Sequence, residues 1–256
     1  MSETINTACA DCAFHSVAQL KKLGVNAENA DFVVALAGNP NTGKSTVFNA
    51  LTGLRQHTGN WPGKTVARAE GGFVYKDKRF KLVDLPGTYS LLSTSQDEEI
   101  ARNFILFGRP DVTVVVVDAS RLERNLNLVL QVLEITDKAV LCLNLIDEAE
   151  RHDIRIDDRK LAKDLGIPVV PTSARSGRGI PELIDAVFQV ASNQIVCKPH
   201  RIKNLSEQVS RAVEELSKKL TGRYPGIPNT RWIAMRLLDG DPRIMEALRN
   251  NEFVAT

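Results

Sequence analysis

The residues best suited to chemistry in this sequence form one short run, from Gly38 to Ser45. The run reads GNPNTGKS and fits the phosphate-binding loop pattern G-x-x-x-x-G-K-[ST]. In such a loop the backbone N–H groups, together with the N-terminus of the following helix, point at a polyphosphate. Lys44 would reach the β- and γ-phosphates, and the hydroxyl of Ser45 would bind Mg²⁺. The run therefore predicts a nucleotide site rather than a glycine turn that binds nothing.

A second motif, Asp84–Gly87 (DLPG), ends another predicted strand, 40 residues after Lys44. A carboxylate at this place can hold Mg²⁺ through water, and the N–H of Gly87 can sense a γ-phosphate. Taken alone, the motif is more simply a strand followed by a Pro-Gly turn. Its position relative to the phosphate loop favours the functional interpretation.

Two further motifs indicate which base is bound. Asn144–Asp147 (NLID) closes a buried strand, and Ser173–Arg175 (SAR) follows the next one. The carboxylate of Asp147 can accept both N1–H and the 2-amino group of guanine, a donor pair that adenine lacks. A backbone N–H of the SAR motif can meet guanine O6. Because ligands of open α/β sheets bind at the carboxyl ends of the strands, the motifs together predict a guanine-nucleotide site.

The elements that must position these motifs alternate between strand and helix from Asp31 to about residue 192. Strands are predicted at 32–37, 66–76, 79–84, 112–117, 139–144 and 168–171, and helices at 44–53, 97–107, 122–135, 157–165 and 180–191. This alternation predicts an α/β fold with a mostly parallel six-stranded sheet and helices on both faces. The strands 66–76 and 79–84, joined by a short polar turn, are expected to form an antiparallel hairpin.

After residue 200 the strand signals stop. Helices are predicted at 204–220, 230–238 and 242–249, with a break at 221–226 and with Asp241 as the N-cap of the last helix. We therefore divide the chain into a flexible leader (1–30), an α/β domain (31–195) and a small all-α subdomain (196–256).

Composition excludes several classes of protein. The chain has 256 residues, of which 43% are hydrophobic and 25% charged, as in soluble globular proteins. A formal net charge of +2 argues against a dedicated nucleic-acid binder. No apolar stretch is long enough to span a membrane, and the N-terminus does not resemble a signal peptide. A disulfide framework is not expected from the four cysteines, which indicates a reducing compartment.

Four segments together carry a resemblance to a known family. They are Gly38–Asn41 (GNPN), Gly59–Val66 (GNWPGKTV), Asp84–Leu91 (DLPGTYSL) and Val117–Leu126 (VDASRLERNL). With these motifs the sequence resembles the small GTPase superfamily and, within it, the cytoplasmic N-terminal region of the ferrous iron transport protein B (FeoB) family. The resemblance covers residues 32 to about 190 and extends more loosely to the helical part through Arg231-Trp232 and residues 237–241.

The resemblance implies a P-loop GTPase fold and roles for individual residues. Thr65 matches the switch I threonine that reaches Mg²⁺ and the γ-phosphate, so Ser45, Thr65 and Asp84 are expected around Mg²⁺. Asn41 and the backbone carbonyls of Gly59 and Trp61 match a K⁺ site, and Asn41, Lys44, Thr65 and Gly87 are expected to act in catalysis. The residues expected around GTP or GDP are Gly38, Asn39, Pro40, Asn41, Thr42, Gly43, Lys44, Ser45, Thr46, Gly63, Lys64, Thr65, Val66, Asp84, Leu85, Pro86, Gly87, Asn144, Leu145, Ile146, Asp147, Ser173, Ala174 and Arg175.

Two departures from the superfamily pattern qualify this expectation. Thr88 stands where many GTPases have a water-orienting Gln, and Ser95 with Glu98 is more simply a helix capping box than a source of a general base. We therefore expect slow hydrolysis. Leu145 stands where the superfamily usually has Lys, which predicts modest nucleotide affinity and fast exchange.

The sequence thus predicts a GTP-binding and slow, K⁺-stimulated GTP-hydrolysing module that regulates Fe²⁺ uptake at the cytoplasmic face of the bacterial inner membrane. We expect it to be part of a longer protein whose membrane permease domain is its partner, and to bind no nucleic acid. A homo-oligomer formed through the membrane part and small cytoplasmic accessory proteins stay open as further partners. Two alternative functions stay open: a soluble K⁺-dependent GTPase of RNA modification or ribosome assembly, and a nucleotide-gated binding switch with incidental hydrolysis.

One motif is left unassigned. Cys9, Cys12 and His15 have the spacing of half a zinc-type site, which Cys197 and His200 or a second chain would have to complete. The simpler interpretation is two thiols on a flexible leader.

Overall fold

The computed structural model describes residues 20–53, 56–92, 95–201, 205–224, 227 and 229–250. The chain divides into two compact units, Met1–His200 and Arg201–Thr256. The first unit is α/β and the second is all-α, as expected. This division places residues 196–200 with the α/β unit rather than with the helical one.

The α/β unit is built on one sheet of seven strands in the order β2-β3-β4-β1-β5-β6-β7. Its strands are β1 (Phe32–Gly38), β2 (Gln56–Asn60), β3 (Ala67–Tyr75), β4 (Lys78–Asp84), β5 (Val112–Asp118), β6 (Ala139–Asn144) and β7 (Val169–Pro171). Neighbouring strands from β4 to β7 are parallel, whereas β3 is antiparallel to both β4 and β2. The mostly parallel sheet and the hairpin are confirmed. The predicted count of six strands is wrong, because β2 adds a seventh at the edge.

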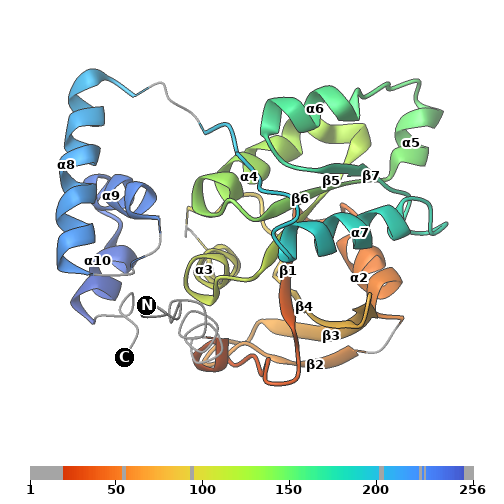
Figure 1. The fold of residues 1–256 in the computed structure, drawn as a ribbon, viewed down its shortest axis with the longest axis horizontal. Coiled ribbons are helices and arrows are strands. Elements are labelled where there is room, and N and C mark those ends of the chain that lie inside the picture. Colours follow the sequence, from red (N-terminus) through yellow and green to blue (C-terminus); the bar gives the residue numbers. More distant parts are fainter. Residues whose placement is uncertain are drawn as a thin grey trace, which may run out of the picture. The chain divides into compact units, whose positions relative to one another are not determined.

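Helices cover both faces of this sheet, as predicted. Figure 1 shows α2 and α7 on one side of it and α3 and α4 on the other. The helices of the unit are α2 (Lys44–Thr52), α3 (Gln96–Asn103), α4 (Leu122–Ile135), α5 (Ile146–Arg151), α6 (Asp158–Leu165) and α7 (Ile180–Ala191). Because both faces are covered, β5 and β6 are buried along their whole length and read as continuous apolar runs in the sequence.

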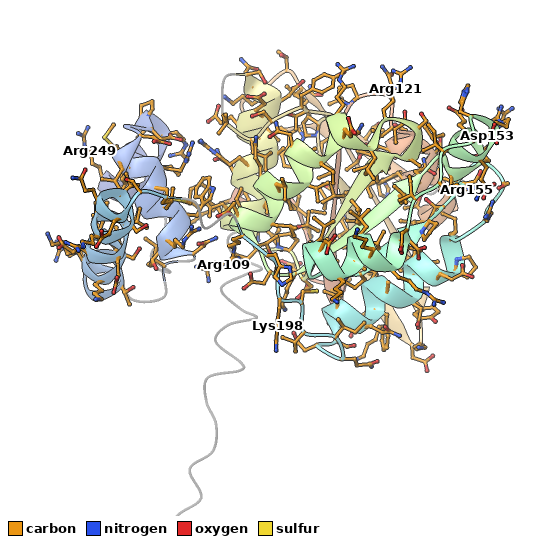
Figure 2. All side chains as sticks on the ribbon, turned by 90° about the horizontal axis from the view of Figure 1, so that it is seen from above. Arg109, Arg121, Asp153, Arg155, Lys198 and Arg249 are labelled. Carbon is orange, nitrogen blue, oxygen red and sulfur yellow. The ribbon has the colours of Figure 1, made fainter. Side chains whose placement is uncertain are left out.

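Two helical segments differ from the prediction. The single helix expected at 97–107 is α3 followed by a π-helix, Phe104–Gly108, and α5 was not expected. Ser95 is confirmed as the N-cap of α3, because its side chain accepts a hydrogen bond from the N–H of Glu98, which is one of the two bonds of the predicted capping box. The charged stretch between α5 and α6 is an exposed surface, and Figure 2 shows Asp153 and Arg155 at its rim.

The helical unit consists of α8 (Glu207–Arg223), α9 (Thr230–Leu238) and α10 (Pro242–Arg249). The side chain of Asp241 accepts hydrogen bonds from the N–H groups of Arg243 and Ile244, which confirms it as the cap of α10. The break expected to begin at Thr221 is wrong, because α8 continues to Arg223. Trp232, Ile233 and Ile244 are among the buried side chains of the helical unit. In the part of the chain that the structure describes, no helix is both long enough and apolar enough to cross a membrane.

Candidate nucleotide site

The predicted phosphate loop joins the end of β1 to the start of α2. Its backbone is left-handed at Asn41 (φ 66°) and Gly43 (φ 76°). A Cβ atom on Gly43 would lie 2.4 Å from Nδ2 of Asn144, and one on Gly38 would lie 2.6 Å from the carbonyl oxygen of Val116. Glycine is therefore required at both ends of the loop, where other parts of the chain approach its backbone.

Lys44 and Asp84 meet beside this loop. Parallel pairing of β1 and β4 puts Leu36 opposite Asp84, which brings the carboxylate to the strand ends where the loop begins. The ammonium group of Lys44 forms an ion pair and a hydrogen bond with the Asp84 carboxylate, and both side chains are mostly buried. Burial raises the pKa of Asp84, and the charge of Lys44 opposes this shift. Ser45 is adjacent, in the first turn of α2, so a hydroxyl and a carboxylate oxygen suited to Mg²⁺ lie on neighbouring elements.

The segment after Asp84, switch II (residues 84–92), crosses the phosphate loop. The N–H of Thr88 donates to the carbonyl of Gly38 at 3.2 Å. A Cβ on Gly87 would lie 3.5 Å from the backbone nitrogen of Pro40. The hydroxyl of Thr88 hydrogen-bonds to the carbonyl of Ser90, so its side chain stabilises a local turn and supplies no general base.

The base motifs are joined to the phosphate loop through Asn144. Its Nδ2 donates to the carbonyl of Thr42 at 2.9 Å, while its Oδ1 accepts from the N–H of Ala174 at 3.1 Å and from the hydroxyl of Thr172 at 3.3 Å. Asn144 is 1% exposed, so these bonds are made without competition from water. One side chain thereby joins the loop at residues 38–45 to the loop at residues 172–175.

Asp147 and Leu145 complete this side of the site. The pKa of Asp147 is lowered, first by a hydrogen bond from Ser173 and further by Arg151, whose Nη2 lies 3.2 Å from its Oδ2. The carboxylate is therefore ionised at neutral pH, as acceptance of two guanine N–H groups requires. A methyl of Leu145 would lie 3.9 Å from a Cβ on Gly43, so this side chain flanks the phosphate loop.

Switch I (residues 56–66) is held away from the phosphate loop. Gly59 lies on β2 opposite Arg68, and β2 is three strands away from β1, about 14 Å at the usual strand spacing. Trp61 is 3% exposed, and its carbonyl accepts a hydrogen bond from the N–H of Lys64 at 3.0 Å. The side chain of Lys64 pairs with Glu99 of α3 at 3.2 Å, and Thr65 is exposed. The structure thus brings together Lys44, Asp84 and the base motifs, but not Asn41 with the carbonyls of Gly59 and Trp61.

One residue outside the motifs also contributes. Gln131 of α4 accepts hydrogen bonds through Oε1 from the N–H of Leu91 at 2.6 Å and from the hydroxyl of Ser90 at 3.3 Å. It therefore tethers the end of switch II to a helix 40 residues further along the chain. Sequence reasoning missed it because a glutamine on an amphipathic helix carries no local signal.

The unassigned cysteine motif stays a prediction. Cys9, Cys12 and His15 lie outside the described residues. Cys197 and His200 are described, and they contact the backbone carbonyls of Ala139 and Asp164, respectively. Within the described residues no group of three or more His, Cys, Asp or Glu side chains is placed to hold a metal ion.

Comparison with known protein families gives two matches that together span most of the chain. A family model described as "Ferrous iron transport protein B" matches residues 32–187, and one described as "FeoB cytosolic helical domain" matches residues 206–256. Among curated proteins, the Fe(2+) transporters FeoB of Shigella flexneri and of Escherichia coli K12 are each 44% identical to the chain over 212 residues. Each match covers 81% of this chain but 27% of the relative, so the chain spans about a quarter of those proteins.

Solved structures show the same similarity. The cytosolic domain of T. maritima FeoB in a GMPPNP form is 41% identical, with a TM-score of 0.77 and a coverage of 84% of both chains. A GDP form of the same domain gives a TM-score of 0.75 at 41% identity, covering 84% of this chain and 83% of that one. The cytosolic domain of L. pneumophila FeoB is 37% identical, with a TM-score of 0.76 and a coverage of 84% of both chains.

Proposed function

The chain belongs to the ferrous iron transport protein B family, and from this we propose that it binds and hydrolyses GTP as the regulatory module of an Fe²⁺ transporter. The observation that carries the proposal is the bridge made by Asn144 between Thr42 and Ala174. It fixes a phosphate loop and a guanine-type base motif at one edge of the sheet. The GDP and GMPPNP forms of a 41% identical domain support the same ligand class.

The residues at this edge of the sheet would have different roles in binding the nucleotide. Backbone N–H groups of the phosphate loop and the Lys44 ammonium would hold the phosphates, and Asp147 would select guanine by accepting N1–H and the 2-amino group. Ser45 and Asp84 supply the oxygen atoms for Mg²⁺, which would neutralise phosphate charge when bound. To reach the phosphates, Lys44 must separate from Asp84. The ion pair between them would then be replaced by two contacts, one of Lys44 with the phosphates and one of Asp84 with Mg²⁺.

Hydrolysis requires a different switch I from the one seen here. Gly59 lies on β2, three strands away from β1, the Trp61 carbonyl already accepts a hydrogen bond from the N–H of Lys64, and Thr65 is exposed. We propose that GTP draws residues 56–66 off β3 towards the loop, as in other order-changing switches. K⁺ stimulation through Asn41, Gly59 and Trp61 depends on the same movement, because these groups are not assembled here.

The test of the site is nucleotide binding and turnover in Mg²⁺ buffer, with K⁺ against Na⁺. We expect GTP hydrolysis that K⁺ accelerates and that Asn41→Ala makes insensitive to K⁺. Asp147→Asn should reduce the preference for GTP over ATP while leaving the fold intact. Binding of GTP with no turnover in either salt would favour the nucleotide-gated binding switch, an alternative supported by the use of the Thr88 hydroxyl within switch II.

The iron-related part of the proposal rests on the relatives. They are Fe(2+) transporters, and this chain aligns with about a quarter of their length. We propose that the chain acts at the cytoplasmic face of the inner membrane, with the permease part of such a transporter as its partner. The helical unit would pass the state of the switches to that partner. Protease protection of residues 205–250 with and without a non-hydrolysable GTP analogue tests this relay, and unchanged protection would argue against it.

A further inference from the structure

Residues 20–30, which we call the strap, are packed although the sequence assigns them to a flexible leader. They precede β1 and lie outside the residues 32–187 that match the family model. Leu20, Val25 and Ala27 are 1%, 0% and 4% exposed. In Figure 1 the strap is the red segment beside the ends of β2 and β3.

The strap has a defined local structure. Its helical turn ends with hydrogen bonds from the N–H of Gly24 to the carbonyl of Lys21 (2.9 Å) and from the N–H of Val25 to that of Leu20 (2.8 Å). Gly24 has a φ of 80°, and Leu20 and Val25 are both buried. This arrangement is a Schellman motif, so the sequence LKKLGV specifies the end of the turn.

The strap contacts switch I and the strand that follows it. A Cβ on Gly24 would lie 2.6 Å from Cγ of Pro62 and 2.4 Å from Nη1 of Arg68. The same Nη1 donates to the carbonyl of Leu23 at 3.4 Å. The backbone of Gly24 therefore lies directly against the segment that must move if switch I is to reach the phosphate loop.

A second contact anchors the strap to the body of the unit. A Cβ on Gly108, at the end of the π-helix, would lie 3.2 Å from a methyl of Leu23 and 3.3 Å from a methyl of Leu20. The π-helix also packs against switch I, because Phe104 and Trp61 meet edge-to-face with ring centroids 5.6 Å apart. The strap thus contacts the π-helix and Arg68, and both of these pack against the ring of Trp61.

Trp61 is held by packing contacts, and its indole N–H has no acceptor among the described residues. The guanidinium of Arg68 lies 5.5 Å from the centre of its ring. The indole N–H is also buried. A buried N–H without an acceptor costs free energy, so the position of Trp61 depends on the contacts around it.

We infer that the strap is an intramolecular brake that holds switch I on β3 and slows its movement towards the nucleotide. The inference deepens the proposed function and rests on it for the nucleotide effect. The strap contacts residues 56–66 directly where Gly24 meets Pro62, and indirectly through Arg68 and the π-helix, which both pack against Trp61. Release of the strap should make switch I mobile and speed the association of GTP.

The primary test is hydrogen exchange of the amides of residues 56–66 in Gly24→Ala, measured without nucleotide. The added methyl would collide with Pro62 and Arg68, so we expect exchange at least tenfold faster than in the wild type. Gly53→Ala is the matched control, because Gly53 also has a positive φ (59°) but an added Cβ there meets no atom within 4 Å. Trp61 emission, read in a Trp232→Phe background, should shift to the red for Gly24→Ala only.

A double variant checks that the effect passes through the proposed contact. Pro62→Ala removes the ring atoms that the new methyl would meet in switch I but leaves Arg68 in place, so the effect of Gly24→Ala on exchange should be smaller when it is added to Pro62→Ala than in the wild type. If Gly24→Ala does not fold, chains beginning at Leu20 and at Asp31 replace it, and the chain without the strap should exchange faster at residues 56–66. Equal exchange in Gly24→Ala and Gly53→Ala, or in the two shortened chains, would overturn the inference.

The nucleotide arm separates the brake from the proposed function. With a fluorescent GTP analogue and Mg²⁺, the association rate should rise at least threefold in Gly24→Ala and stay unchanged in Gly53→Ala. A wild-type chain that binds no GTP would refute the proposed function, and the exchange data would still decide whether the strap holds switch I. Faster exchange without faster association would refute the regulatory role.

Discussion

Lys44 and Asp84 neutralise one another at the end of the phosphate loop. The two side chains come from different elements, α2 and β4, and in the proposed function they would separate to contact nucleotide and metal, respectively. Their pairing keeps a cation and an anion in a mostly buried place where neither would be stable alone.

This pair predicts a pH effect on stability. Burial raises the pKa of Asp84 in the folded protein above its unfolded value, so the folded state holds the proton more tightly. The free energy of unfolding should therefore fall as pH rises from the unfolded pKa to the folded one, and Asp84→Asn should remove this part of the slope. Denaturant unfolding between pH 4 and 7 checks it when followed by Trp61 emission in a Trp232→Phe background. Asp77→Asn, at an exposed turn, is the control, and an identical slope in Asp84→Asn and the wild type would contradict the prediction.

The hydrogen bonds of Asn144 predict that two substitutions, Asn144→Ala and Thr172→Val, differ in the size of their effect. Asn144→Ala leaves the carbonyl of Thr42 and the N–H of Ala174 without this partner, at a cost of about 1–3 kcal/mol for each buried group left unpaired. Thr172→Val removes the 3.3 Å bond to Asn144 and the 3.2 Å contact with Sγ of Cys142 but leaves both bonds of Asn144 to the backbone, so it should cost less. Thermal unfolding and GDP affinity should both fall in this order. A larger effect from Thr172→Val would show that Asn144 is not the main link between the two loops.

Gln131 predicts a role for α4 in ordering switch II. Gln131→Leu removes the acceptor from the N–H of Leu91, a residue that is 2% exposed, and should speed hydrogen exchange at residues 90–92. GTP turnover should fall more than GTP affinity, because Gln131 contacts the switch rather than the phosphate loop. Gln131→Glu keeps an oxygen at the acceptor position and should restore most of the protection. Equal losses in both variants would point to packing instead of the hydrogen bond.

The ion pairs of Glu70 are expected to stabilise β3 where it pairs with β2. Its carboxylate pairs with Arg68, at 2.8 Å, and with Lys81, and its side chain is only 10% exposed. Glu70→Gln keeps the volume but removes the charge, leaving two mostly buried cations without their partner. We expect a loss of about 1–3 kcal/mol in the free energy of unfolding, less than for a fully buried pair. Glu182→Gln, at an exposed position on α7, is the control in the same denaturant titration.

Local sequence is enough for the elements that carry their own pattern. The buried runs of β1, β5 and β6, together with the spacing of Lys44, Asp84 and Asn144, suffice to place the phosphate loop and the base motif at one edge of the sheet. The contacts that join the two are not predictable in this way, since the bond from Asn144 to Thr42 links residues 102 positions apart.

The elements that the sequence does not predict lack a hydrophobic pattern of their own. Residues 56–60 (QHTGN) have no apolar alternation, and they form β2 because β3 offers them an edge to pair with. The π-turn at 104–108 follows α3 without a break in the apolar pattern, and α5 is too short for its period to show. The strap is packed because Gly108 and Gly24 leave room for close approach, which is a property of two glycines 84 positions apart and not of either neighbourhood.

The position of β2 has a consequence for the loaded protein. While switch I is on β3, β2 is the outermost strand and β3 is paired on both sides. If residues 56–60 leave, β3 becomes the border of the sheet, and backbone donors and acceptors between Ala67 and Gly71 lose their partners. Binding of GTP would then expose the backbone edge of β3, and another extended segment could pair with that edge as an added strand.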